Sequence, residues 1–176
     1  MTLRLVRPDL YFFEQYNDMM REWLESGTQI APWFLVKPFD SLDAFAQYIR
    51  MLYESEMGLQ DSRFCSTSSY FVLDENDRLV GAARLGHYLT VAGLNTYGHI
   101  GYGVRPGERN KGYATEVLRM CLAEARERKM HRCLLGAHTS NTASCRVIEK
   151  CGGILENIVP DPENADETIS RYWIRL

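Results

Sequence analysis

The chain has 176 residues, a length typical of one domain. Its composition is 45% hydrophobic and 24% charged, which excludes a disordered or low-complexity protein. Twenty basic side chains against 23 acidic ones leave a net charge of −3, so binding to nucleic acid or to an anionic membrane surface is not expected. We therefore expect one soluble domain over residues 1–176, with a core that needs no cross-links.

The sequence also lacks the signals of export and of metal binding. Residues 1–8 do not form the apolar run of a signal peptide, and no stretch approaches the roughly 20 apolar residues that span a bilayer. No Cys-x-x-Cys pair is present, and no histidine spacing completes a zinc pattern. We expect reduced thiols, no metal site and a cytoplasmic location. The cysteines are Cys65, Cys121, Cys133, Cys145 and Cys151.

In chain order, the first half of the sequence predicts a strand, two helices and a hairpin. Apolar side chains recur at helical spacing in both helices, and each helix begins at a residue that can cap it and ends at a glycine. The hairpin strands are short β-prone runs on either side of a polar turn. The predicted elements are a strand at 3–6, a helix between Asp9 and Gly27, a loop of bulky side chains at 30–35, a helix between Ser41 and Gly58, and hairpin strands at 70–73 and 79–85.

The second half predicts a glycine-rich strand followed by alternating helices and strands. Glycine weakens a strand unless the strand bulges or another group packs closely on its backbone. The expected fold is α/β (α+β), a mixed and mostly antiparallel central sheet of about seven strands flanked by about four helices. The predicted elements are a strand at 97–104, a helix from about Gly112 to Lys129, a strand at 133–137, a helix at 142–150 capped by Asn141, and a hairpin of 154–159 and 170–176 with a polar loop at 161–167.

The loop before residue 113 carries the strongest chemical signal. It joins a strand to a helix, and the first turn of a helix has unpaired N–H groups and the positive end of the helix dipole, which favour an anion. Gly112 lets the backbone approach a ligand, and Arg109 and Lys111 add positive charge. The loop is not a P-loop, because Tyr113 stands where that motif needs a lysine. A pyrophosphate cradle and a plain helix start packed on the sheet are both open on these grounds.

Two segments resemble a known family. Residues 109–114, with the sequence RNKGYA, match the R/Q-x-x-G-x-G/A signature of the GCN5-related N-acetyltransferase (GNAT) superfamily. Residues 141–153, which end in an EK-x-G sequence, are similar to the second acetyl-CoA segment of that family. The predicted order of elements is that of the family as well, so the resemblance covers essentially the whole chain. It extends to bacterial predicted acetyltransferases whose strand reads GHIGYGVRP.

The resemblance implies acetyl-CoA as a co-substrate and assigns residues to it. The strand ending at Gly103 and Val104 would present its backbone to the pantetheine arm, and its glycines would form a bulge that parts it from the next strand. Asn141 and Ser144 would contact the coenzyme on its other side, with a helix cap and an ordinary first-turn position as their alternatives. The pyrophosphate would bind the N–H groups of Arg109, Asn110, Lys111, Gly112, Tyr113 and Ala114.

The implied reaction is attack by an amine on the thioester. It needs an acceptor for the amine proton and a donor to the developing oxyanion. His99 and His138, on the strands that would flank the thioester, are candidate bases, and a strand histidine satisfied by hydrogen bonds is the alternative for each. Tyr102 is a further candidate beside the thioester. The tyrosine with which many family members protonate the leaving thiolate is absent here, because Ile148 occupies its position.

The acceptor site is expected in the N-terminal half. Its candidate residues are Pro32, Trp33 and Phe34, the loop near Phe64 to Ser69, and Arg84. A place in the core is the alternative for Trp33, and Arg84 would either pair with an acidic substrate group or point to solvent. The expected function is N-acetylation of a small molecule, an amino acid or a peptide. A non-catalytic acyl-CoA-binding module, and an acyltransferase with another acyl group or a hydroxyl acceptor, are the alternatives. A homodimer is compatible with each.

Overall fold

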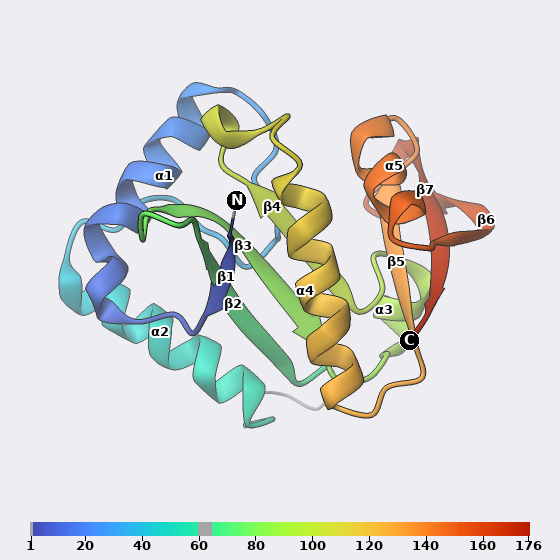
Figure 1. The fold of residues 1–176 in the computed structure, drawn as a ribbon, viewed down its shortest axis with the longest axis horizontal. Helices are drawn as coiled ribbons and strands as arrows, with labels where there is room; N and C mark the ends of the chain where they lie inside the picture. The colour runs from blue at the N-terminus through green and yellow to red at the C-terminus, as the bar shows by residue number, and fades with distance from the viewer. Residues whose placement is uncertain (1, 60–64) are drawn as a thin grey trace.

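The computed structural model describes residues 2–59 and 65–176, and these ranges contain seven strands, five α-helices and two 3-10 helices (Figure 1). The order is the predicted one with one addition, the short helix α3, so the expected number of about four helices was too low. The strands are β1 (Arg4–Val6), β2 (Thr67–Leu73), β3 (Leu79–Gly86), β4 (Ile100–Val104), β5 (Arg132–His138), β6 (Ile154–Asp161) and β7 (Asn164–Arg175). The helices are η1 (Leu10–Phe12), α1 (Phe13–Glu25), α2 (Leu42–Glu56), α3 (Val91–Asn95), η2 (Pro106–Glu108), α4 (Tyr113–Glu127) and α5 (Thr142–Lys150).

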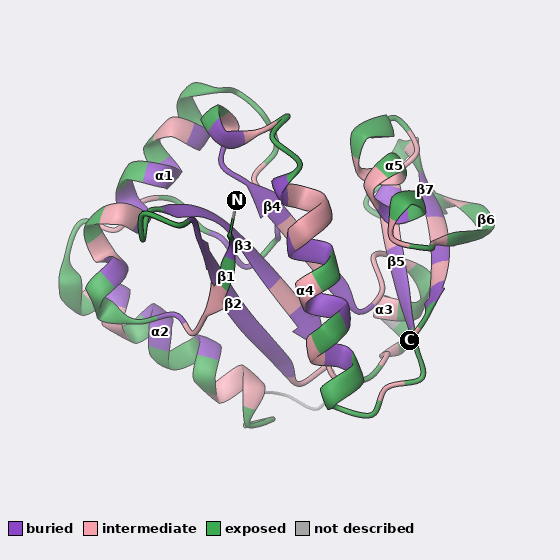
Figure 2. Ribbon diagram, viewed as in Figure 1, coloured by how far each residue is buried: buried purple, intermediate pink, exposed green. Residues whose placement is uncertain are grey.

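The first four strands form an antiparallel sheet in the order β1–β2–β3–β4. Helices α1 and α2 cover one face and α4 covers the other, so β2 and β3 are buried along nearly their whole length (Figure 2). Strand alternation turns Phe71 and Ala82 towards α1 and α2, and Val72 and Ala83 towards the core beneath α4. The continuous apolar runs of these strands therefore reflect two covered faces.

The last three strands form a second antiparallel sheet in the order β5–β7–β6, so the single central sheet expected from the sequence is in fact two sheets. The residues before β4 turn towards β5, which is why β4 begins at Ile100. The connections between the sheets at this seam are a bridge between Gly98 and Leu135, an N–H of His99 donated to the carbonyl of Leu134 at 2.8 Å, and an N–H of Gly136 donated to the carbonyl of Tyr97 at 3.1 Å.

The glycines of β4 do not form the predicted bulge, because β3 and β4 pair in unbroken register over all five residues of β4. They allow the loop at 29–34 to rest directly on the strand. A Cβ at Gly103 would clash with the carbonyl oxygen of Ala31, and a Cβ at Gly101 would lie 3.2 Å from a side-chain atom of Pro32. Close packing, and not a change of register, explains this glycine pattern.

The C-terminal hairpin is longer than predicted. β6 extends to Asp161 and β7 starts at Asn164, so most of the expected polar loop at 161–167 is strand. All five cysteines fall in the described ranges and are free thiols. In the same ranges, no helix is long and apolar enough to cross a membrane, and no three His, Cys, Asp or Glu side chains are grouped so that they could hold a metal ion.

Candidate active site

The divergence of β4 from β5 leaves a gap between the two sheets. β4 is an edge strand of the first sheet, so its outer backbone groups face this gap and are available for an extended ligand. A hollow of about 230 Å³ occupies it. The lining comes from the loop at 29–33, from Tyr97, from β4 (Ile100, Gly101, Tyr102), from β5 (Leu135, Gly136, Ala137, His138), from α5 and its cap (Asn141, Ser144, Ile148), and from Glu163.

Free backbone N–H groups gather at the start of α4. The backbone adopts the left-handed conformation at Asn110 (φ 64°) and at Gly112 (φ 81°). A Cβ added to Gly112 would have no described atom within 4 Å. Glycine is thus required by the backbone angle, and the space above it is open. Within the described ranges, the N–H groups of Gly112, Tyr113 and Ala114 donate no hydrogen bond. Together with the dipole of a 15-residue helix they favour an anion.

Arg105, the residue directly after β4, does not face the open space above Gly112. Arg105 is buried, and its guanidinium pairs with Glu22 and, at 2.9 Å, with Asp18. Burial alone would raise the pKa of the Glu22 carboxyl, but hydrogen bonds from Arg105 and from the N–H of Gly107 lower it below its usual value. Arg105 therefore holds the end of β4 to α1.

The two other basic side chains of the loop also have partners. The guanidinium of Arg109 donates to the hydroxyl of Thr28 at 2.9 Å, and the ammonium of Lys111 donates to Glu108 at 2.7 Å. The positive potential at the N-terminus of α4 therefore comes mainly from its backbone N–H groups and the helix dipole.

The opposite wall of the gap is the first turn of α5. The side chain of Asn141 accepts the N–H of Ser144 at 3.0 Å, which confirms the predicted cap, and both residues line the hollow. The hydroxyl of Tyr102, which also lines it, is buried and makes no hydrogen bond of ordinary geometry to any described residue. Burial raises the pKa of this phenol, and the nearby Ser144 side chain lowers it by less. Ile148, in the same wall, supplies no proton donor. Tyr102 is thus the unsatisfied polar group of this part of the site.

A hydrogen-bonded cluster stands at the end of β5. Nε2 of His138 lies 2.8 Å from a carboxylate oxygen of Asp161 and 2.9 Å from the hydroxyl of Tyr97, which also donates to Asp161 at 3.2 Å. An N–H of Glu163 and the His138 bond lower the pKa of Asp161, so this buried carboxyl is ionised. Burial and the Asp161 charge raise the pKa of Tyr97 to about 12. A neutral phenol and a carboxylate therefore share one imidazole nitrogen.

His99 lies elsewhere. It is buried at the seam between the sheets and is not part of the lining of the gap. Its Nδ1 accepts the N–H of Leu134 at 2.9 Å, and burial lowers its pKa. This is the arrangement of a strand histidine satisfied by hydrogen bonds.

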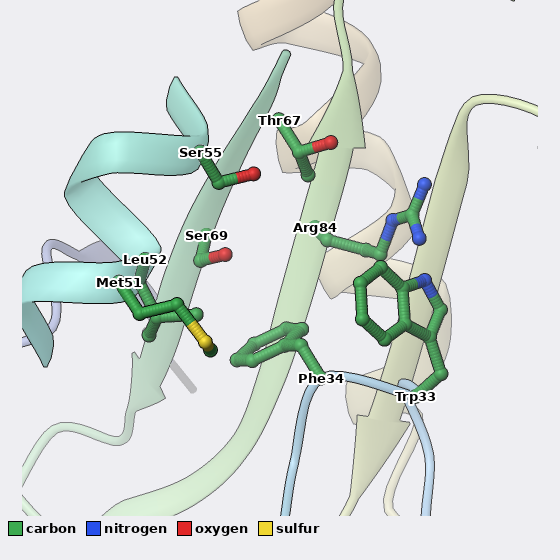
Figure 3. Close-up of a pocket in the computed structure, with 8 residues that line it drawn as sticks. All are labelled: Trp33, Phe34, Met51, Leu52, Ser55, Thr67, Ser69 and Arg84. Atoms are coloured by element: carbon green, nitrogen blue, oxygen red, sulfur yellow. The ribbon is translucent and has the colours of Figure 1, made fainter. Parts of the chain in front are cut away.

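A second hollow of about 170 Å³ lies between α2, β2 and β3 (Figure 3). Trp33 lines both hollows. Arg84 lies in its wall, stacked on the Trp33 ring with the guanidinium carbon 4.9 Å from the ring centroid, and so does not point freely to solvent. Of the predicted acceptor loop, Thr67 and Ser69 line this hollow, whereas Phe64 falls outside the described residues.

The acetyltransferase (GNAT) family model matches residues 17–153, which is more than half of the chain. The chain belongs to the GNAT acetyltransferase family. It is therefore an acyltransferase whose donor is acetyl-CoA, as the two sequence motifs implied. The features just described fit that donor: free N–H groups for its pyrophosphate, an unpaired strand edge for its extended arm, and an unpartnered hydroxyl in the gap.

Solved structures of low sequence identity share the fold. The microcin C7 self-immunity acetyltransferase MccE, in complex with acetyl-CoA and AMP, is 14% identical with a TM-score of 0.72, covering 99% of this chain and 92% of that one. RimL, a ribosomal L7/L12 α-N-protein acetyltransferase in complex with coenzyme A, is 15% identical with a TM-score of 0.71, covering 100% and 95%. The spermidine/spermine N-acetyltransferase SpeG from Vibrio cholerae is 16% identical with a TM-score of 0.65, covering 98% and 93%. A search of curated protein sequences finds no match.

No sequence pattern indicates the partners of His138. Tyr97 lies in a predicted strand and Asp161 in a predicted polar loop, 41 and 23 residues away from His138 in sequence. The one local signal was the position of Asp161 between two prolines, which marks a constrained turn.

Proposed function

We propose that this protein transfers the acetyl group of acetyl-CoA to an amine of a small molecule, an amino acid or a peptide, in the gap between β4 and β5. The observation that carries the proposal is the gap itself, with its anion-favouring N–H groups at one element and its His138 cluster at another. The matched relatives act, by their names, on spermidine, on a ribosomal protein and in microcin immunity, so they support the reaction and leave the acceptor open.

The coenzyme-binding residues follow from this placement. The loop from Arg109 to Ala114 holds the pyrophosphate, with the free N–H groups of Gly112, Tyr113 and Ala114 as its main donors and Asn110 shaping the turn. Lys111 adds charge when it leaves Glu108. Acetyl-CoA supplies an acyl group activated as a thioester.

The rest of the coenzyme contacts come from the two walls of the gap. Gly103 and Val104 end the strand whose free edge lies along the pantetheine arm, and Asn141 and Ser144 bind from the side of α5. N–H groups of the same strand edge face the thioester oxygen, where a donor stabilises developing negative charge.

The His138 cluster takes the proton of the attacking amine. Nε2–H of His138 and the Tyr97 hydroxyl both donate to the Asp161 carboxylate, which leaves Nδ1 of His138 as the basic nitrogen. The N–H bond of the amine breaks as the Nδ1–H bond forms. His99 has no part in this step, because its Nδ1 is occupied by Leu134 and its ring lies outside the lining.

Tyr102 is the proton donor to the leaving thiolate. Its hydroxyl is protonated at neutral pH, lies in the lining of the gap and has no competing partner. A free thiol has a pKa of about 8.5, so a thiolate is a tolerable leaving group and Tyr102 contributes modestly.

Two properties of the whole protein complete the proposal. Five free thiols suit the reducing cytoplasm, where we place the enzyme. A homodimer stays a prediction, which light scattering of the purified chain tests directly. Either state leaves the chemistry of the gap unchanged.

Calorimetric titration of acetyl-CoA tests the binding site. Gly112→Glu places bulk and negative charge where the pyrophosphate binds, so we expect at least about a 100-fold loss of affinity. Gly152→Glu is the matched control, because Gly152 also has a positive φ (91°) and open space around it but ends α5. Equal affinity in the two variants contradicts the assigned cradle.

Thiol release from acetyl-CoA across a panel of amines tests the reaction. Turnover with any amine supports the transferase. Tight binding of acetyl-CoA without thiol release across the panel favours the non-catalytic module instead. Comparison of acetyl-, succinyl- and longer acyl-CoA, and of hydroxyl acceptors, separates the remaining alternatives.

A further inference from the structure

Arg84 is a partly buried cation that has no carboxylate partner among the described residues. Its Nε is inaccessible to solvent and makes no hydrogen bond, and within the described ranges no carboxylate pairs with its guanidinium. Burial lowers its pKa to about 10, which still leaves it charged at neutral pH. Removing an unpaired charge from water is costly, and buried charges in proteins are normally paired. Arg105, which is more fully buried, has two carboxylate partners.

The backbone places hydroxyl groups beside this arginine. Ser69 of β2 and Gly101 of β4 are the cross-strand neighbours of Arg84, so the three share one row on the face towards α1 and α2. The hydroxyl groups of Ser55, Thr67 and Ser69 point towards the side of the hollow where Arg84 lies (Figure 3). The Thr67 hydroxyl donates to the carbonyl of Cys65 at 2.9 Å, so Ser55 and Ser69 would supply the neutral donors to an anion that binds Arg84.

Trp33 fixes the arginine in a usable orientation. Stacking occupies one face of the guanidinium, whereas its N–H groups lie in its plane and point outward from the rim. Since Gly101 has no side chain, the Arg84 stem can lie across it, with side-chain carbons 3.2 Å and 3.5 Å from the position of a Cβ. The ring contact therefore leaves the N–H groups at the rim, which bind a carboxylate in pairs, available to a ligand.

The remainder of the hollow is apolar. Phe34 and Leu52 are buried in its wall, Met51 lies beside them, and the Tyr48 hydroxyl donates to the carbonyl of Phe34 at 3.1 Å and so fixes that segment. A volume of about 170 Å³ suits a compact ligand. The chemistry is that of a small molecule with one anionic group and an apolar body.

This hollow shares the Trp33 side chain as a wall with the gap described above. Trp33 lines both, and Gly101, the strand neighbour of Arg84, lines the gap. A molecule whose anionic group lies at Arg84 can therefore present a second group on the other side of Trp33.

We propose that Arg84 is the binding residue for a carboxylate of the acceptor, so that the acceptor is a compact amino acid with an apolar side chain, its carboxylate on Arg84 and its amine in the gap. This inference rests on the proposed function for the fate of the amine, whereas the carboxylate site stands on its own geometry. A polyamine is a poor acceptor here, because Arg84 would meet a second cation without an anion.

Binding by calorimetry in the presence of coenzyme A tests the site without any turnover. The probes are the apolar amino acids from alanine to phenylalanine, each with its amide and with the amine that lacks the carboxyl group. We expect at least one acid to bind at least about tenfold more tightly than its amide and its amine. Arg84→Met should abolish this difference, and Arg84→Lys should retain part of it. Arg119→Met, at an exposed position of α4, should leave it unchanged.

Thermal melts and acetyl-CoA affinity show that each variant is folded. Phosphonate analogues of the same amino acids complete the panel: binding of the phosphonates with no binding of the acids overturns the assignment of a carboxylate. An acid–amide difference that survives in Arg84→Met, or no difference for any probe, overturns the proposal.

The two proposals fail separately. Thiol release with amines that lack a carboxylate, at rates equal to those of the acids and unaffected by Arg84→Met, leaves the transferase and removes the Arg84 site. Arg84-dependent binding of acids with no thiol release from acetyl-CoA leaves the site and removes the transferase.

Discussion

The imidazole of His138 shares its Nε2 with one phenol and one carboxylate, and this sharing sets the chemistry available to it. The Asp161 carboxylate accepts the hydrogen on Nε2 and so fixes the tautomer that leaves Nδ1 free, and the Tyr97 hydroxyl donates to the same carboxylate and holds it in place. A lone histidine on a strand has neither property. At the scale of single residues, the partners and not the histidine make the candidate base.

Replacing His138 with Gln should lower kcat by about 100-fold or more, because the proton acceptor is lost. The Kd for acetyl-CoA should change little, since the cradle lies on another element. Steady-state kinetics and calorimetry measure the two effects. His131→Gln, at an exposed position, is the control and should behave as the unmodified protein. Full activity in His138→Gln would sink this assignment.

The sequence supports some of these residue assignments and not others. Gly112 begins a helix and Asn141 caps one, as predicted, because helix starts and caps are local features that a sequence reveals. The partners of His138 and the isolation of Arg84 depend on pairs far apart in the chain. The sequence shows which residues stand at these positions but not which distant residues they contact.

At the scale of elements, β4 does two tasks with its two sides. One backbone edge pairs with β3 and the other faces the gap. One face is so close to the loop at 29–34 that side chains are excluded at two alternate positions. The prediction of a strand here is therefore confirmed. Its glycines are explained by the close contact of the loop at 29–34, which no sequence pattern indicates.

Gly103→Ala should destabilise the protein by about 3 kcal/mol, because the added Cβ meets the fixed backbone of Ala31. Gly101→Ala is the matched control. Its Cβ would meet only side chains of Arg84 and Pro32 at 3.2 Å, which can shift, so a cost of about 1 kcal/mol is expected. Urea unfolding of both variants measures the difference. A larger cost at Gly101 than at Gly103 contradicts the close contact.

At the scale of the whole molecule, two sheets are joined along a short seam. The predicted order of elements was right because hydrophobic periodicity and caps are local, and only the short α3 was missed. The split into two sheets was not predicted, because strand pairing is a contact between distant segments. His99 lies in this seam, where its ring accepts the N–H of Leu134.

Acid should therefore loosen the seam. Because burial lowers the pKa of His99 below its value in the unfolded chain, the unfolded state binds more protons and stability falls as the pH drops through about 6.5. Protonation of Nδ1 would also remove its acceptor for Leu134. Free energies of unfolding between pH 7.5 and 5.5 should fall in the unmodified protein and fall less in His99→Asn, whose side-chain oxygen can still accept that N–H. An unchanged slope in the variant would argue against this role.

Trp33 lines both hollows, so a substitution there affects both the acceptor site and the gap in which the acetyl group is transferred. A substitution there would alter the choice of acceptor and the turnover of every acceptor at once, so selection for a new substrate would rarely favour it. Met51 and Leu52 touch only the second hollow. Changes in substrate range, in natural variants or in a directed library, should accumulate on α2 while the tryptophan is spared.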